Sequence, residues 1–319
     1  MSAPVGSIQP EADELPLVSV VIPAYNVEAY VAEAVDSALA QTYPRVEIVA
    51  VDDGSTDRTA EILAGYGDAI TVVIQENHGL GAARNSGLRA SKGSLIGLLD
   101  ADDIWLPQRL ESLVPLLVAR PEIGIVTSNS FVMEETTPTL KQCYGDRRRH
   151  PFPAREEDQL DEIAHRNFLF VSVVFRRDLV DRFGGFDDAM RRSEDYELWT
   201  RYLVNGARAA YVPESLGYYR VRTGSLSRSP EQWGAHLTVL ERHLPEMWRQ
   251  GATGRARDAF EIGEQLAARD ERRRAFQFFS HAVRGHELNV STRARLAGVA
   301  VRRLVLGSRD SGSRSVNAG

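Results

Sequence analysis

An alternation of strand-like and helix-like segments limits what this chain can fold into more than any other feature. Four short apolar runs occupy residues 17–22, 46–51, 70–74 and 95–99. Helix-like segments follow them at residues 27–39, 56–66, 81–90 and 107–119. In the first of these, apolar side chains recur three and four positions apart, which is typical of an amphipathic helix. Alternating units of this kind predict a parallel sheet with right-handed crossovers, so we expect an α/β fold.

Polar and acidic residues follow the carboxyl end of each predicted strand. They comprise Pro23–Asn26, Asp52–Asp53, Gln75–Gly79 and Asp100–Asp103. Ligands of parallel sheets bind outside the carboxyl ends of the strands, so these four segments should meet at one site. Asp100 and Asp102 suit a hard divalent cation whose other positions hold phosphate and water. The sequence therefore predicts a cleft that handles phosphate.

Weaker patterns describe the rest of the chain. We expect strands at 123–133 and 171–175, helices at 158–167 and 178–183, and a polar loop at 134–153. Ser193 is expected to cap a helix that runs to about residue 204, as Asn26 would cap the first helix. Residues 16–229 would form one domain and 230–307 a helical appendage. Residues 1–15 and 308–319 are expected to be disordered.

Composition excludes several classes of protein. At 319 residues, 43% of them hydrophobic, the chain can build one large domain with an appendage. The single Cys143 rules out an internal disulfide and is interpreted as an incidental thiol in a reducing compartment. We find neither a signal peptide nor a run of about 20 apolar residues that could span a bilayer. These observations predict a cytoplasmic protein.

Charge is unevenly distributed along the chain. The net charge is −6, yet residues 270–319 contain ten arginines and four acidic residues. The acidic predicted site argues against nucleic acid as a partner. Arg293, Arg295, Arg302 and Arg303 surround apolar residues in a pattern that suits peripheral contact with an anionic membrane. The same helices could equally pack on residues 16–229 of their own chain or on a second subunit of a homodimer.

Seven segments, in order, resemble the family 2 glycosyltransferases, which have the GT-A nucleotide-diphospho-sugar transferase fold. The segments are VSVVIPAYN (18–26), VDDGSTD (51–57), NHGLGAARNSG (77–87), LLDADD (98–103), GGFD (184–187), SEDYELWTR (193–201) and YYRVRTGSLS (218–227). The resemblance implies an inverting enzyme that moves a sugar from a nucleoside-diphosphate sugar to an acceptor hydroxyl. A UDP sugar is favoured as donor, with dTDP and GDP sugars left open. The acceptor would be a cell-surface glycan, a lipid-linked intermediate or a natural product.

The resemblance also implies roles for individual acids. Asp102 would bind Mn²⁺ or Mg²⁺ directly, while Asp100 would reach the cation directly, through water, or contact the ribose instead. A metal so placed stabilises the departing diphosphate as a Lewis acid. Asp195 would take the proton of the acceptor hydroxyl, with Glu194 as an orienting neighbour. One in-line displacement of this kind needs a base and no enzyme nucleophile.

Nucleotide contacts are carried over from the matching positions. They comprise Pro23, Ala24, Tyr25, Asn26, Asp53, Arg84, Ala101 and Arg222. Tyr25 and the backbone of Ala24 would lie against the base, and Asp53 would accept a hydrogen bond from it. Arg84 would approach the base or the diphosphate, since a guanidinium matches phosphate geometry. Many relatives have histidine where Arg222 stands; arginine can pair with phosphate but cannot ligate a metal as imidazole does.

Three other classes of protein match the sequence less well. A dehydrogenase would carry Gly-x-Gly-x-x-Gly in its first strand–helix turn, whereas the nearest string here, 79–84, follows the third strand and ends in arginine. A nucleotidyltransferase would need a glycine-rich basic loop after the first strand. A catalytically silent nucleotide-sugar-binding protein is also compatible with the scaffold, although Asp102 and Asp195 are both present.

Overall fold

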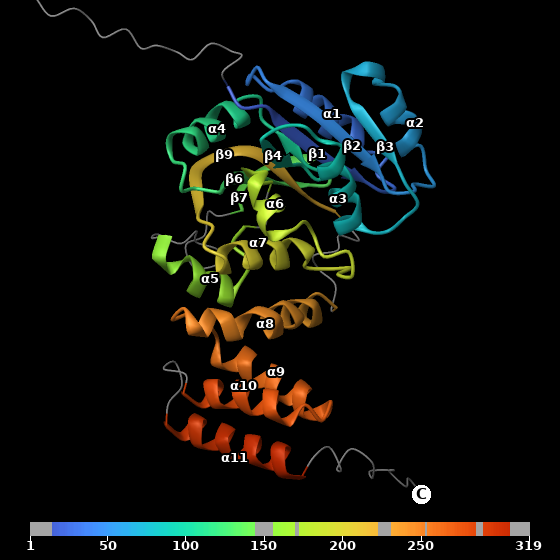
Figure 1. The fold of residues 1–319 in the computed structure, drawn as a ribbon. Coiled ribbons are helices and arrows are strands. Elements are labelled where there is room, and N and C mark those ends of the chain that lie inside the picture. The colour runs from blue at the N-terminus through green and yellow to red at the C-terminus, as the bar shows by residue number, and fades with distance from the viewer. Residues whose placement is uncertain are drawn as a thin grey trace, which may run out of the picture. The chain divides into compact units, whose positions relative to one another are not determined.

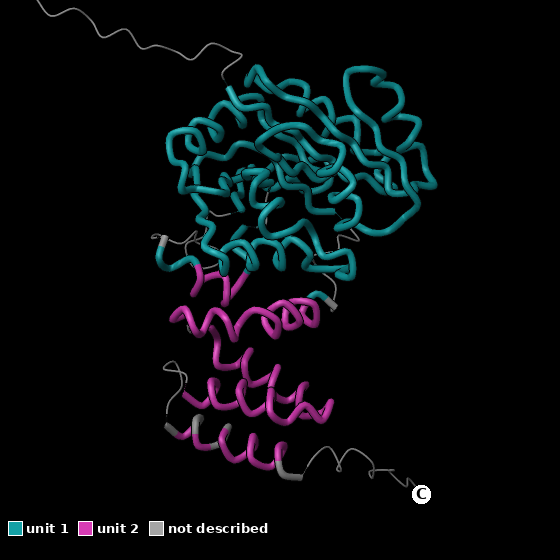
Figure 2. The backbone as a smooth tube through the Cα atoms, viewed as in Figure 1, with its two compact units in different colours: residues 1–159, 167–232 teal, residues 160–166, 233–319 magenta. Residues whose placement is uncertain are grey.

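The computed structural model describes residues 15–143, 156–169, 172–222, 231–252, 254–284 and 290–306. Two segments expected to be disordered, 1–15 and 308–319, lie outside these ranges, apart from residue 15. Part of the loop expected at 134–153 also lies outside them. Figure 2 shows two compact units, described separately below. The first comprises residues 1–159 and 167–232, and the second comprises residues 160–166 and 233–319.

The predicted alternation forms the parallel half of the sheet in the first unit (Figure 1). Its strands are β1 (Val18–Ala24), β2 (Val46–Asp52), β3 (Thr71–Ile74) and β4 (Leu95–Leu98). They lie in the order β3-β2-β1-β4, and each neighbouring pair is parallel. The helices that connect them are α1 (Val31–Leu39), α2 (Thr59–Ala64) and α3 (Leu80–Ala90), with a short 3-10 turn at Gly67–Ala69. This part of the fold agrees with the prediction.

Both faces of this half are covered because side chains alternate along β1, and all seven of its residues are buried. Val20 and Ile22 join a core cluster with residues of α1 and α4 (Arg109–Ala119). Val21 faces α3 instead, where a Cβ at Gly87 would lie 2.3 Å from the Val21 Cγ1. A strand that is covered on both faces has to be apolar along its length, which explains the continuous apolar run of β1.

The other half of the sheet is mixed. It contains β5 (Ile104–Trp105), β6 (Ile125–Glu134), β7 (Thr137–Gln142), β8 (Val174–Arg176) and β9 (Ala209–Val221). Strand β8 runs antiparallel to both β4 and β6, while β9 runs parallel to β6 and antiparallel to β5. The hairpin of β6 with β7 replaces the first part of the expected polar loop, and β9 was not predicted.

Helices of the first unit surround this mixed half. They are α4, the start of α5 (Gln159–His165) after a 3-10 turn at Glu156–Asp158, α6 (Asp178–Phe183) and α7 (Glu194–Val204). Trp199 of α7 is 1% exposed and packs against Phe175 and Tyr202, at 5.4 and 6.1 Å between ring centroids. It belongs to the core, where burying a side chain of this size contributes about 1.5–3 kcal/mol.

One predicted helix cap is wrong, and a second stands at the predicted N-cap position without a capping hydrogen bond. Helix α1 begins at Val31, and Asn26 has a left-handed backbone with φ of 51°. Its Oδ1 accepts from the backbone N–H of Thr56 at 2.8 Å, so the side chain joins two loops instead of capping a helix. Ser193 precedes α7, also with a left-handed backbone, but makes no side-chain cap bond. The Ser193 hydroxyl accepts from Gln232 Nε2 at 2.9 Å.

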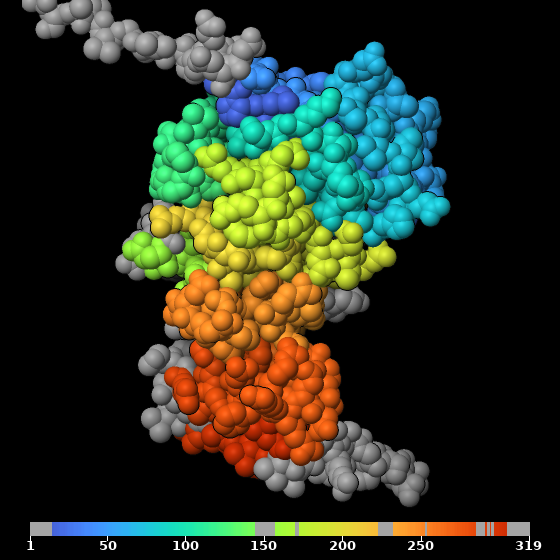
Figure 3. Space-filling model, in the orientation of Figure 1, coloured from blue at the N-terminus to red at the C-terminus, as the bar shows by residue number. Residues whose placement is uncertain are grey.

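The second unit contains most of α8 (Glu231–Arg249) together with α9 (Ala256–Ala268), α10 (Arg272–Arg284) and α11 (Val290–Leu306). Ile262, Leu266, Phe278 and Phe279 are buried in it. In Figure 3 the side chains of α9 and α10 fill the space that separates their ribbons in Figure 1.

The surface of α10 and α11 bears on the membrane hypothesis. Phe276 and Val301 are 61% and 60% exposed, but the side chains of Arg293 and Arg295 lie outside the described residues. Peripheral membrane contact therefore stays a prediction. None of the helices in the described ranges combines the length and apolar character that crossing a bilayer requires.

Candidate active site

One pocket of about 610 Å³ lies in the first unit at the carboxyl ends of β1, β2 and β4. The start of α3, the start of α7 and the end of β9 complete its wall. All the site residues predicted from the sequence line it: Pro23, Ala24, Tyr25, Asn26, Asp53, Arg84, Asp100, Ala101, Asp102, Asp195 and Arg222. The fold brings together residues spread over 200 positions of sequence. Their individual roles stay predictions.

Asp53 organises the wall expected to receive the nucleotide. It is 3% exposed, and its carboxylate accepts from Gln75 Nε2 at 2.7 Å and from the backbone N–H groups of His78 and Gly79 at 3.0 and 2.8 Å. These three hydrogen bonds hold the loop after β3 against the end of β2. Tyr25, 47% exposed, lies at the same wall with its ring open to solvent.

The acids after β4 are paired with arginines. Asp100 Oδ1 accepts from Arg84 Nη2 at 2.7 Å, and Asp102 Oδ2 accepts from Arg222 Nε at 2.7 Å. Burial and then the charge of Asp100 raise the pKa of Asp102, although Arg222 opposes the shift. Asp103 is buried, and burial followed by the charges of Asp102 and Asp100 raises its pKa well above the usual range. Negative charge is therefore in local excess here.

This excess fits a divalent cation. Asp100 and Asp102 are oxygen donors of the kind that Mg²⁺ and Mn²⁺ prefer, and a bound cation would relieve their mutual repulsion. Among the residues that the structure describes, no three Asp, Glu, His or Cys side chains converge into a complete cation site. Asp100 and Asp102 are therefore the two carboxylates that could hold a cation here, and the other ligands would have to come from outside the protein.

The acids at the start of α7 lie in a different environment. Glu194 is 6% exposed and accepts from Arg84 Nη1 at 2.7 Å. Asp195 is half-buried, and its Oδ2 accepts from Asn167 Nδ2 at 2.9 Å. Burial and then the charge of Glu194 raise the pKa of Asp195 to about 7, with Arg84 opposing. A carboxylate that titrates near neutrality is well matched to accepting a proton.

Arg84 joins the two acidic pairs. Its guanidinium is buried, lies 5.3 Å from the centre of the Phe186 ring, and gives one terminal nitrogen to Asp100 and the other to Glu194. The sequence placed this residue against the base or the diphosphate. In the structure both terminal nitrogens have carboxylate partners. Arg84 therefore connects the end of β4 to the start of α7.

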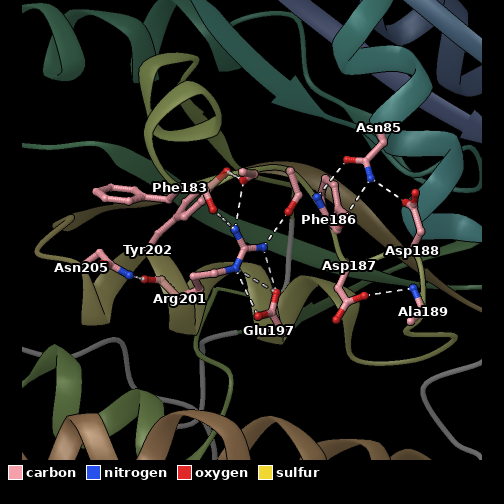
Figure 4. Close-up of polar contacts among 12 residues, drawn as sticks. Asn85, Phe183, Phe186, Asp187, Asp188, Ala189, Glu197, Arg201, Tyr202 and Asn205 are labelled. Carbon is pink, nitrogen blue, oxygen red and sulfur yellow. Dashed lines mark hydrogen bonds and ion pairs between the residues drawn. The ribbon is translucent and has the colours of Figure 1, made fainter.

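The GGFD turn holds α7 in place (Figure 4). Arg201 Nη2 donates to the Gly185 carbonyl at 2.6 Å and to Glu197 Oε2 at 2.9 Å. From α3, Asn85 accepts from the Phe186 N–H at 2.8 Å and donates to the Phe186 carbonyl at 2.9 Å. A Cβ at Gly185 would push against Asn85 Oδ1, so a side chain there would have to displace the Asn85 amide from its hydrogen bonds with Phe186. Three of the sequence blocks, at 77–87, 184–187 and 193–201, are thus partners in one structural unit.

Sequence reasoning missed two side chains that support the site. Asn167 reaches the proposed base from the segment after α5. Arg220 is 2% exposed, and its Nε donates to the Asp102 carbonyl at 2.6 Å while its Nη2 donates to Glu33 Oε2 at 2.6 Å. Their partners lie 28 to 187 positions away in the sequence, so no local pattern could reveal them.

Comparison with known proteins agrees with this geometry. Residues 19–184 match glycosyl transferase family 2. An uncharacterized glycosyltransferase of Rickettsia prowazekii (strain Madrid E) is 32% identical over 188 residues, which cover 59% of each chain. The succinoglycan biosynthesis protein ExoO of Rhizobium meliloti (strain 1021) is 34% identical over 226 residues, 69% of this chain and 65% of ExoO. The chain thus spans 59% to 65% of the length of these curated relatives.

A crystal structure of residues 1–349 of S. aureus TarS superimposes with a TM-score of 0.56 at 19% identity. It covers 91% of this chain and 81% of the crystallised 1–349 chain. The protein therefore has a GT-A-type α/β fold with a helical C-terminal region, as predicted. The chain belongs to glycosyl transferase family 2.

Proposed function

We propose that the pocket binds a nucleoside-diphosphate sugar, of the UDP type, and transfers its sugar to an acceptor hydroxyl with inversion. One observation carries the proposal: paired carboxylates suited to a cation and an aspartate whose pKa is raised to about 7 line the same pocket. Family membership supports the reaction class. TarS has been crystallised with UDP and with UDP-GlcNAc, which supports a UDP donor by analogy of fold.

On the donor side, the segment Pro23–Asn26 and Asp53 would form the nucleotide wall, with Ala101 below the diphosphate. Asp102 would hold Mn²⁺ or Mg²⁺, with Asp100 as a direct or water-mediated ligand. When bound, such a cation offsets the charge that develops on the departing diphosphate. Arg222 would contact the same diphosphate, because a guanidinium pairs well with phosphate oxygens.

On the acceptor side, Asp195 would accept the proton of the acceptor hydroxyl while its oxygen attacks the anomeric carbon. The bond to the diphosphate breaks on the opposite face and the diphosphate leaves with the electron pair, so configuration inverts. No enzyme nucleophile is required. Burial raises the pKa of Cys143 to about 12, and the thiol does not line the pocket, which agrees with an incidental cysteine. A hydroxyl of a glycan, a lipid-linked intermediate or a small molecule would serve as acceptor.

A donor screen tests this function without knowledge of the acceptor. The full chain is incubated with UDP, dTDP and GDP sugars with and without Mn²⁺, and release of nucleoside diphosphate by slow hydrolysis is measured. We expect cation-dependent release from a UDP sugar and its loss in Asp195→Asn. The variant should still bind UDP, as shown by a thermal shift.

Two rival functions give different results in this screen or in a parallel incubation with a nucleoside triphosphate and a sugar phosphate. A silent binding protein would show a thermal shift with a sugar nucleotide but no release in the wild type. A nucleotidyltransferase would instead form pyrophosphate from a nucleoside triphosphate and a sugar phosphate. Either result would overturn the proposal.

A further inference from the structure

A guanidinium rests on one of the two carboxylates that the proposed function assigns to the cation. Arg222 Nε lies 2.7 Å from Asp102 Oδ2, and the Arg222 guanidinium carbon lies 5.6 Å from the centre of the Tyr30 ring. Both partners of the ion pair are partly exposed in the pocket, 32% for the Arg222 side chain and 22% for that of Asp102. Solvent and ligands can therefore reach the pair.

Arg220, two positions earlier, shows by contrast what a fixed arginine looks like in this fold. Its side chain is 1% exposed and is held by the Asp102 and Glu135 carbonyls, by Glu33 and by the face of Tyr30. Among the described residues, Arg222 makes one ion pair and one ring contact at the pocket surface. A partly exposed ion pair with a single partner is only weakly stabilising, so Arg222 can change partner at little cost.

A divalent cation and the Arg222 guanidinium compete for Asp102. Two positive groups on one carboxylate repel each other strongly at the separations involved. The second carboxylate is also engaged, because Arg84 occupies Asp100 Oδ1 at 2.7 Å. With at most two protein carboxylates available in the described part of the chain, the cation is poorly held by the protein alone.

A bound diphosphate changes this balance. It adds negative charge and phosphate oxygens, which are good partners for both a guanidinium and a divalent cation. Arg222 can then exchange Asp102 for a phosphate oxygen, which leaves the Asp102 carboxylate to the cation.

We propose that Arg222 makes binding of the cation and of the nucleoside diphosphate mutually dependent. Before the diphosphate binds, Arg222 neutralises Asp102 and weakens cation binding; afterwards it contacts the diphosphate and the cation binds at Asp102. This inference rests on the proposed function, which assigns Asp100 and Asp102 to the cation.

Binding measurements without turnover test the inference. The affinity for Mn²⁺ is measured by titration calorimetry with and without UDP, in the wild type, in Arg222→Gln and in Arg191→Gln. Arg191 is a matched control, since it lines the same pocket but donates to the His78 carbonyl, at 2.8 Å, and forms no ion pair among the described residues. Thermal melting with UDP verifies that each variant is folded.

In the wild type, UDP should increase the affinity for Mn²⁺ by about tenfold or more, within the usual range of coupling between sites. Arg222→Gln should bind Mn²⁺ about tenfold more tightly than the wild type when UDP is absent, and the increase caused by UDP should then be smaller than in the wild type, because only direct ligation of Mn²⁺ by the diphosphate remains. Because coupling between two ligands is reciprocal, Arg222→Gln should show the same loss of coupling when its affinity for UDP is measured with and without Mn²⁺. Arg191→Gln should keep the wild-type coupling.

The inference is overturned if Arg222→Gln binds Mn²⁺ no more tightly than the wild type without UDP, or if it keeps the wild-type coupling. Failure of the proposed function looks different. In that case neither the wild type nor the variants would bind Mn²⁺ even in the presence of UDP, and the cation assignment would fall with the inference.

Discussion

The two acidic pairs of the pocket contain the same kinds of side chain in contrasting environments. At the end of β4, the Asp100 side chain is 41% exposed and Asp102 is paired with the partly exposed Arg222. At the start of α7, the Glu194 side chain is 8% exposed and the pKa of Asp195 is raised to about 7. The first environment leaves two carboxylates open to ligands and to a cation, and the second suits a carboxylate that gains and loses a proton. Environment, more than residue type, separates the two chemistries.

The largest effect is expected when the proposed proton acceptor, Asp195, is removed. Asp195→Asn should lower the rate of nucleoside diphosphate release by about 10²–10⁴-fold, the usual contribution of a general base. The dissociation constant for UDP should be unchanged, because Asp195 is proposed to act on the acceptor. Asp102→Asn should instead weaken Mn²⁺ binding in the presence of UDP. Equal effects of both substitutions on Mn²⁺ binding would show that the two pairs are not functionally distinct.

The next largest effect is expected where the two pairs are joined. Arg84→Gln leaves Glu194 buried without its cationic partner, and breaking a buried pair typically costs about 3–5 kcal/mol. Because the Asp100 side chain is partly exposed, most of this cost should come from Glu194. Urea denaturation measures the free energy of unfolding, with Arg191→Gln as the exposed arginine control. A loss no larger than that of the control would mean that Arg84 does not tie the pairs together.

The pH dependence of stability sharpens the comparison further. Asp195 has a pKa of about 7 in the folded protein, above its value in the unfolded chain, so between about pH 4 and 7 the folded state binds more protons. The free energy of unfolding therefore falls as pH rises through this window. At about 1.4 kcal/mol per pKa unit, the contribution is at most about 4 kcal/mol.

The same titration should shape activity and should be absent from the variant. The release rate should rise with pH and level off above pH 7. Asp195→Asn should gain stability relative to the wild type between pH 5 and pH 8, measured by urea denaturation at each pH. A constant difference between the two proteins across this range would contradict a raised pKa at Asp195.

The sequence was most informative where structure is determined locally. Strands β1 to β4 are short apolar runs separated by helices, so their order and direction follow from pattern and handedness. The acidic pairs could be placed because they directly follow a strand or open a helix. Strand β9 shows the opposite case. It contains Pro213, Glu214 and Gly217 and lacks a regular apolar alternation. Its pairing with β6 is interrupted by two shifts in register. Its pairing partners decide its conformation.

The supporting side chains of the site were also beyond sequence reasoning. Glu33, which holds Arg220, lies 187 positions away from it. Arg201 could be paired with Glu197 from its spacing of four residues, but its bonds to the GGFD backbone depend on how α7 packs. Such contacts between distant segments are set by tertiary structure.

The smallest expected effect concerns one of these supporting side chains. Asn167 Nδ2 donates to Asp195 Oδ2 at 2.9 Å and so orients the carboxylate of the proposed base. A hydrogen bond to a charged group contributes about 1.5–3 kcal/mol, so Asn167→Ala should lower kcat by about tenfold or somewhat more. Asn205→Ala is the matched control, since Asn205 lies at the far end of α7 and donates to the Arg201 carbonyl at 2.8 Å (Figure 4). If both variants show the same kcat and the same pH profile, Asn167 has no part in orienting Asp195. If only Asn167→Ala loses kcat and its affinity for UDP is unchanged, the loss lies on the acceptor side of the pocket.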